Sequence, residues 1–152
     1  SGPTTLKRVG FGRVTIDSGV VESVLPWQML PQEPLTASNK ANATYIVASG
    51  HEMSNNGHKV INMLVNGRVA PMGFQAIDVR KPLAAVCRIV QKGNTVVFDS
   101  EQSYILSKKT QLKTPIDLEN GAYVIAVEYL VPSNDEAEWA SSSGSGFTRP
   151  AQ

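Results

Sequence analysis

The stretch VTIDSGVVESVLP, residues 14–26, decides the fold that we expect for this chain. It places the carboxylate of Asp17 in a tight polar turn, Asp17-Ser18-Gly19, with β-branched and aliphatic residues on both sides. Such a turn can hold an acid rigidly at the end of a buried strand. A hydrolase that works with paired carboxylates needs an acid held in this way. The triplet alone also fits an ordinary polar turn, and the apolar flanks favour the functional interpretation.

The composition predicts one folded domain that binds neither nucleic acid nor membrane. Of 152 residues, 41% are hydrophobic and 18% are charged, which disfavours disorder. A formal net charge of +1 disfavours a surface built for phosphate contacts. No apolar run approaches the roughly 20 residues that span a bilayer, and the first residues lack the pattern of a signal peptide. We therefore expect a cytoplasmic protein.

The single cysteine and the two histidines predict neither a metal site nor a catalytic thiol. A single cysteine, Cys87, excludes an internal disulfide and favours a reducing compartment. It lacks a convincing histidine partner, so a thiol protease is disfavoured. His51 and His58 have no evident third ligand, so we interpret them as loop histidines and expect no metal and no cofactor.

Strand patterns dominate the chain, so we expect an all-β fold. Strands or bent hairpins are predicted at residues 7–16, 45–47, 59–64, 69–79, 95–99, 104–106 and 121–130. The segments 95–99 and 104–106 are expected to pair with each other. The segment 69–79 is expected to break at Pro71 and Gly73, and the dipeptides Asn56-Gly57 and Asn66-Gly67 predict hairpin turns. Both faces of residues 121–130 are largely apolar, so this strand should be central or in an interface.

One short helix is predicted near residues 83–91. Pro82 suits the first turn, Leu83, Val86 and Ile89 recur at helical spacing, and Gly93 closes the helix. After Pro132 the chain becomes acidic and then rich in serine and glycine. We therefore divide it into a domain at residues 1–132 and a flexible tail or linker at residues 133–152.

Three segments in this order resemble retropepsin-type aspartic proteases, and most closely the protease segment of copia-type retrotransposon polyproteins. The first is residues 16–26 with Asp-Ser-Gly, the second is the hairpin from Tyr45 to Val60, which looks like the flap, and the third is residues 81–99. Val20 departs from the family pattern, which usually has alanine after the Asp-Ser/Thr-Gly turn. The resemblance covers roughly residues 7–130 and implies a retropepsin-like acid-protease barrel with one short helix near residues 83–91.

The resemblance implies an aspartic endopeptidase that cleaves its own polyprotein. Only one Asp-Ser-Gly is present, and one carboxylate cannot serve as base and acid at once. The family solves this with a homodimer in which Asp17 of each chain meets on a two-fold axis, and the two acids of such a dyad share one proton. Ser18 would then bond across the axis, and Gly19 would permit the close backbone approach. Residues 4–9 and 122–130 are candidates for strands that interleave between protomers.

The family also implies residues that contact an extended peptide bound as an added strand. These predicted substrate-binding residues are Val20, Glu22, Val24, Ser49, Gly50, His51, Ala84 and Ala85. No cofactor is implied, and the cytoplasmic setting would include retrotransposon virus-like particles.

Two alternatives stay open at the level of sequence. The first is a catalytically inactive module of the same fold that serves dimerisation or peptide binding, since fold does not imply function. The second is an unrelated β-sandwich whose Asp-Ser-Gly is accidental, which would be a monomer with the turn on its surface.

Overall fold

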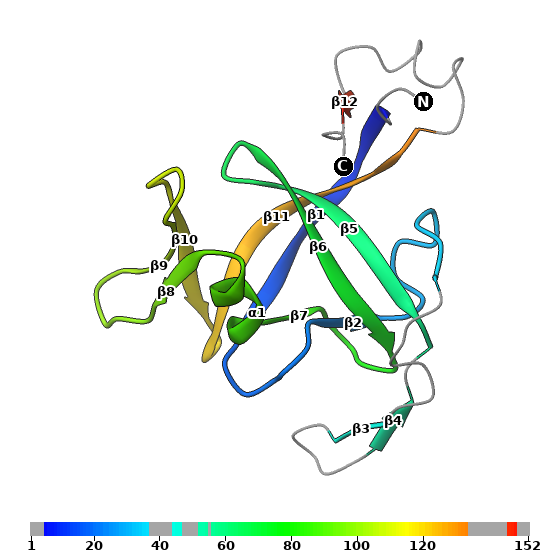
Figure 1. The fold of residues 1–152 in the computed structure, drawn as a ribbon, viewed down its shortest axis with the longest axis horizontal. Coiled ribbons are helices and arrows are strands. Elements are labelled where there is room, and N and C mark those ends of the chain that lie inside the picture. The colour runs from blue at the N-terminus through cyan, green and yellow to red at the C-terminus, as the bar shows by residue number, and fades with distance from the viewer. Residues whose placement is uncertain (1–4, 37–43, 47–51, 55, 134–145, 149–152) are drawn as a thin grey trace.

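The computed structural model describes residues 5–36, 44–46, 52–54, 56–133 and 146–148, and this part of the chain is mostly β with one short helix (Figure 1). The elements are β1 Thr5–Asp17, β2 Val24–Pro26, β3 Thr44–Ile46, β4 Glu52–Ser54, β5 His58–Val65, β6 Arg68–Ile77, β7 Leu83–Ala85, α1 Val86–Gln91, β8 Asn94–Val97, β9 Ser103–Ser107, β10 Lys113–Glu119, β11 Ala122–Pro132 and β12 Gly146–Thr148. The expected predominance of β structure is confirmed.

Most strands belong to one mixed sheet in the order β12-β1-β7-β2-β6-β5-β11-β10-β9-β8. The pairs β1–β7 and β2–β6 are parallel, whereas the other ladders are antiparallel. A further antiparallel pairing of β1 with β11 curls the sheet into a partial ring, as the crossing of these strands in Figure 1 shows. β3 and β4 form a separate two-stranded sheet.

The hydrophobic core lies inside this partial ring. Strand alternation turns Val14 and Ile16 of β1 inward, where they are buried. The core cluster comprises Val14, Ile16, Leu25, Ile61, Met63, Phe74, Ala84, Ile89, Ile116, Ile125, Val127 and Tyr129. Burying each large aliphatic side chain stabilises the fold by about 1.5–3 kcal/mol. The strand that ends in Asp17 is therefore anchored at its inner face.

Several sequence predictions are confirmed. β8 and β9 form the predicted antiparallel pair. β11 is central, with β1 along one side and both β5 and β10 along the other. The turn between β5 and β6 is Asn66-Gly67, with φ values of 49° and 80°. Those positive values are what a two-residue hairpin turn requires, and they explain why asparagine and glycine stand there.

The predicted start of the helix is wrong. Leu83–Ala85 is the extended strand β7, which pairs in parallel with the end of β1, and the helix begins only at Val86. The pairing partner lies far away in the sequence, so the helical spacing of Leu83 with Val86 carried no information about it. The predicted C-terminal end of the helix is confirmed, because Gly93 follows the helix with φ 92°.

A predicted strand break and a predicted hairpin turn are also wrong. β6 runs through Pro71 and Gly73, because Pro71 lies where β6 is paired with β5 alone and β2 joins only from Gln75. Asn56-Gly57 does not join a hairpin, since β4 pairs with β3 while β5 pairs with β6.

The ends of the domain pair within the chain. Residues 6–8 of β1 lie opposite residues 130–132 of β11, so the two segments considered for interleaving between protomers bond to each other. In the predicted tail, residues 146–148 form β12 and pair with residues 5–7 of β1.

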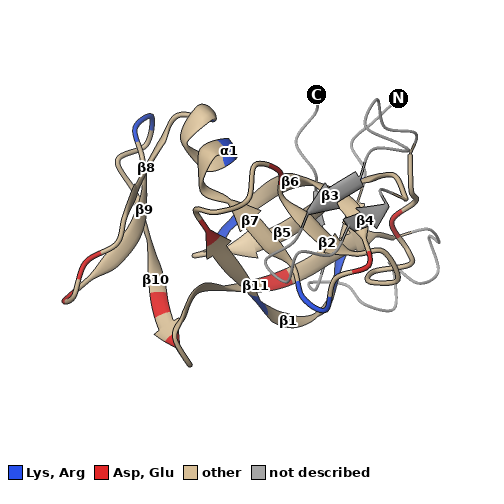
Figure 2. Cartoon of the chain, turned by 90° about the horizontal axis from the view of Figure 1, so that it is seen from below, with Lys and Arg blue, Asp and Glu red and all other residues tan. Residues whose placement is uncertain are grey.

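Basic and acidic residues are interspersed over the described elements, as Figure 2 shows. Among the described residues, no helix has the length and apolar character needed to span a membrane.

Candidate functional site

Asp17 is the last residue of β1 and opens the polar turn that the sequence singles out. Ile16 before it is buried, Asp17 itself is half-buried, and Ser18 and Gly19 are exposed. The backbone N–H of Gly19 donates a hydrogen bond of 2.7 Å to Oδ1 of Asp17. This local bond fixes the orientation of the carboxylate. The acid is thus held on a rigid strand and presented at the surface of the single chain.

Strand β7 runs directly beside Asp17. Ala85 lies opposite Asp17 in the parallel ladder and Ala84 lies opposite Ile16. Both alanines are fully buried. The small side chains let β7 pack closely against the core, and the parallel register brings residues 84–85 beside the end of β1.

Ser23 connects the segment after the turn to two strands. Its hydroxyl oxygen accepts a hydrogen bond of 2.9 Å from the backbone N–H of Ala85, and its carbonyl accepts one of 2.8 Å from the N–H of Gln75. Ser23 is buried. Since a buried N–H without an acceptor is costly, this hydroxyl is required where the chain leaves the turn and enters β2.

The first turn of α1 holds the segment between Gly19 and Ser23. Arg88 donates from Nε to the carbonyl of Val21 at 3.1 Å and pairs through its guanidinium with the carboxylate of Glu22. The thiol of Cys87 donates to the same Val21 carbonyl at 3.4 Å. These contacts, together with Ser23, position the return path of the Asp17 turn.

The predicted substrate-binding residues fall into separate groups. Val20 is half-buried beside the turn, and Glu22 is paired with Arg88. Val24 is buried in β2 like the two alanines of β7, and the contact of these three residues with a peptide stays a prediction. Ser49, Gly50 and His51 lie outside the described residues. β3 and β4 on either side of them do pair antiparallel, as a hairpin requires.

Ser23 and Arg88 are the positioning residues that sequence reasoning missed. Ser23 lies between Glu22 and the apolar residues of β2, and a serine that directly precedes an apolar strand can signal a buried hydrogen bond. Arg88 gave no such signal, since a basic residue on a short helix is ordinary.

The shifted pKa values belong to other parts of the chain. Burial raises the pKa of Tyr129 to about 12. Burial also lowers the pKa of Lys59, against the opposing effect of Glu33, while its ammonium donates to the carbonyls of Met29 and Leu30 at 2.8 and 3.1 Å. Hydrogen bonds from the backbone N–H groups of Glu101 and Gln102 lower the pKa of Asp99.

No group of three or more histidine, cysteine or acidic side chains that could hold a metal occurs among the described residues. His58 is half-buried, and its Nδ1 lies 3.2 Å from Nε2 of Gln75.

The arrangement presents one oriented carboxylate with an exposed apolar side chain close by in the sequence. Val21, two residues beyond the turn, is 68% exposed. A single oriented carboxylate can accept a proton from water but cannot at the same time donate one to a substrate. Comparisons with models of known families, with curated proteins and with solved structures found no match.

Proposed function

We propose that this chain is an aspartic endopeptidase that acts as a homodimer, with a retropepsin-like acid-protease barrel as its fold. The observation that carries the proposal is the placement of Asp17 at the end of β1, oriented by Gly19 and flanked by β7. The order of elements supports it, because the Asp-Ser-Gly strand, a β3–β4 hairpin and a short helix after β7 follow one another.

The chemistry requires a second carboxylate. Glu22, just beyond the turn, is engaged by Arg88 and is therefore poorly suited to act as that second acid. A second copy of Asp17 across a two-fold axis would supply it, and the exposed Ser18, Gly19 and Val21 give the surface for that contact. One carboxylate then takes a proton from the attacking water, while the other, protonated, donates to the scissile carbonyl.

The substrate class is an extended peptide, with the chain's own polyprotein as the first candidate. Such a peptide would lie between the Asp17 turns and the β3–β4 hairpins and would bond through its backbone as an added strand. Val20 is half-buried beside the turn, and in this proposal it would contact side chains of the peptide.

The direct test is peptide hydrolysis by the Asp17→Asn variant. We expect the wild-type chain to cleave members of a peptide library at mildly acidic pH, and Asp17→Asn to lose that activity while it keeps its fold. Asp99→Asn is the matched control, because Asp99 also accepts a hydrogen bond from an N–H two residues on but lies in the turn between β8 and β9. Equal turnover by wild type and Asp17→Asn refutes the proposal. A dimer without turnover of any peptide identifies the inactive module instead.

A further inference from the structure

A cavity of about 310 Å³ lies between the β5–β6 hairpin, the end of α1 and the strands β8 to β10. Aliphatic and methionine side chains form most of its wall, among them Met63, Met72, Ile89 and Ile105. The volume falls within the range of about 300–1,000 Å³ that is typical of small-molecule sites. None of the residues 17–24 lines it, so the cavity is separate from the Asp17 turn.

Most of the neutral polar side chains of the wall are already used by the fold. The amide of Asn66 donates to the carbonyl of Lys113 at 2.8 Å, and that of Asn94 donates to the carbonyl of Ile89 at 2.8 Å. The hydroxyl oxygen of Ser107 accepts from the N–H of Thr110 at 3.3 Å. These groups shape the cavity and are committed to the turns and strands around it.

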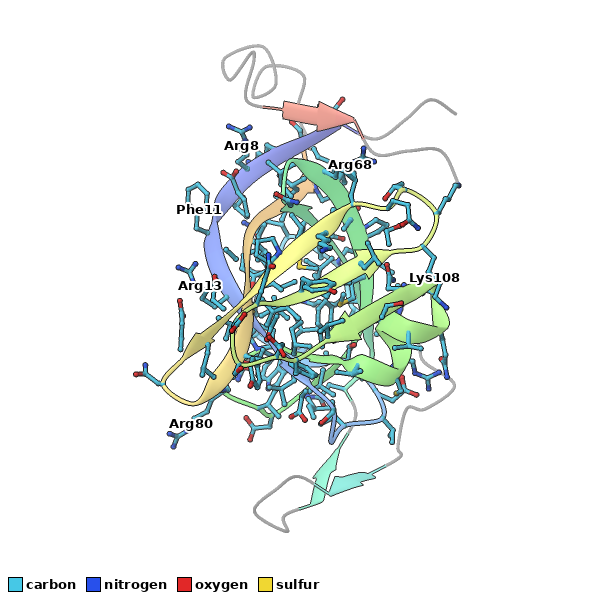
Figure 3. The ribbon with its side chains drawn as sticks, turned by 90° about the vertical axis from the view of Figure 1, so that its left-hand side faces the viewer. Arg8, Phe11, Arg13, Arg68, Arg80 and Lys108 are labelled. Carbon is cyan, nitrogen blue, oxygen red and sulfur yellow. The ribbon has the colours of Figure 1, made fainter. Side chains whose placement is uncertain are left out.

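The charged groups of the wall are all cationic. Arg68, in the β5–β6 hairpin, and Lys92, just after α1, are exposed, and neither side chain forms a hydrogen bond or ion pair with another described residue. Among the described residues that form the wall there is no aspartate or glutamate. Figure 3 shows Arg68 at the hairpin end beside the strands of the β8–β10 region. An apolar cavity therefore opens next to positive charge that nothing in the described part of the chain neutralises.

We propose that this cavity binds a small amphipathic carboxylate, with the aliphatic chain against the methionine and isoleucine wall and the carboxylate at Arg68 and Lys92. Burial of the chain supplies most of the affinity, and the cations select the anionic head group and add a dependence on salt. The inference stands independently of the peptidase proposal, because it uses other residues and a different observable.

Octanoate is the probe, and binding is measured by titration of the full chain while the methionine methyl resonances are followed by NMR. We expect saturable shifts at Met63 and Met72 and weaker binding at high salt. Octan-1-ol and octyltrimethylammonium, which share the chain but not the anionic head, should bind at least about fivefold more weakly, since exposed charge pairs contribute modestly.

The variants separate the head group from the chain. Arg68→Gln with Lys92→Gln should weaken octanoate binding about fivefold to tenfold, whereas Lys109→Gln, an exposed lysine outside the wall, should leave it unchanged. Ala70→Leu, which places extra atoms in the cavity, should also reduce binding, and its circular dichroism verifies the fold. No saturable shift at Met63 and Met72, equal binding of the three probes, or equal affinity of the double variant and the Lys109 control overturns the proposal.

Discussion

The hydroxyl of Ser23 accepts a hydrogen bond of 2.9 Å from the backbone N–H of Ala85, across 62 positions of sequence. Ala85 is in turn the register partner of Asp17. One buried side chain therefore fixes the strand that lies beside the candidate catalytic acid, and the integrity of the site depends on it.

Ser23→Ala should destabilise the fold by about 1–3 kcal/mol, because the Ala85 N–H loses its acceptor in a buried position. Urea unfolding measures the change. Ser100→Ala, at an exposed position, is the control and should stay within about 0.5 kcal/mol of wild type. Equal stability of the two variants would show that the Ser23 bond contributes nothing.

The pair Arg88–Glu22 should show a coupling energy of about 1 kcal/mol in a double-mutant cycle with Arg88→Gln and Glu22→Gln. Partial exposure of the Arg88 side chain lowers this coupling energy through solvent screening, whereas burial of the Glu22 side chain raises it. The pair Arg13–Glu119, exposed at both ends, is the comparison and should couple more weakly. A coupling no larger than that of the exposed pair would contradict a role for Arg88 in holding the Asp17 turn.

Gly12→Ala should destabilise the chain by about 1–3 kcal/mol through overpacking. A Cβ at position 12 would stand 2.5 Å from Cε2 of Tyr129, a residue that is only 7% exposed and has little room to move. The cost should shrink in a Tyr129→Leu background, which removes the clashing ring. Additive effects of the two substitutions would mean that the close approach of Gly12 and Tyr129 is not the cause.

Tyr129 also predicts a loss of stability at alkaline pH. Its pKa is raised by burial to about 12, above the usual value of 10, so the unfolded chain ionises first. The contribution is fully present below pH of about 10 and is lost as the pH rises toward about 12. The free energy of unfolding, followed over this window, should fall more steeply for wild type than for Tyr129→Phe. Parallel curves would contradict the prediction.

Local patterns in the sequence were sufficient for much of the fold. The strands predicted at residues 95–99, 104–106 and 121–130 are present as β8 Asn94–Val97, β9 Ser103–Ser107 and β11 Ala122–Pro132, because strand propensity and burial agree there. The Asn66-Gly67 turn was predicted for a reason of backbone geometry, since both residues adopt positive φ.

What failed depends on contacts between distant residues. Leu83 looked helical by spacing, yet its strand pairs with Thr15–Asp17, and nothing near Leu83 encodes that partner. For the site, the turn at Asp17 was evident from sequence, whereas the support from Ser23 and Arg88 requires the three-dimensional arrangement.

The central claim, that two copies of Asp17 form one site, is tested most directly by mixing. Wild-type chain and Asp17→Asn chain are refolded together in varied proportions at constant total concentration, and peptide hydrolysis is measured. If each active unit needs Asp17 from both protomers, activity follows the square of the wild-type fraction, because mixed dimers are inactive. Activity that falls only in proportion to the wild-type fraction would show that one chain suffices and would contradict the account.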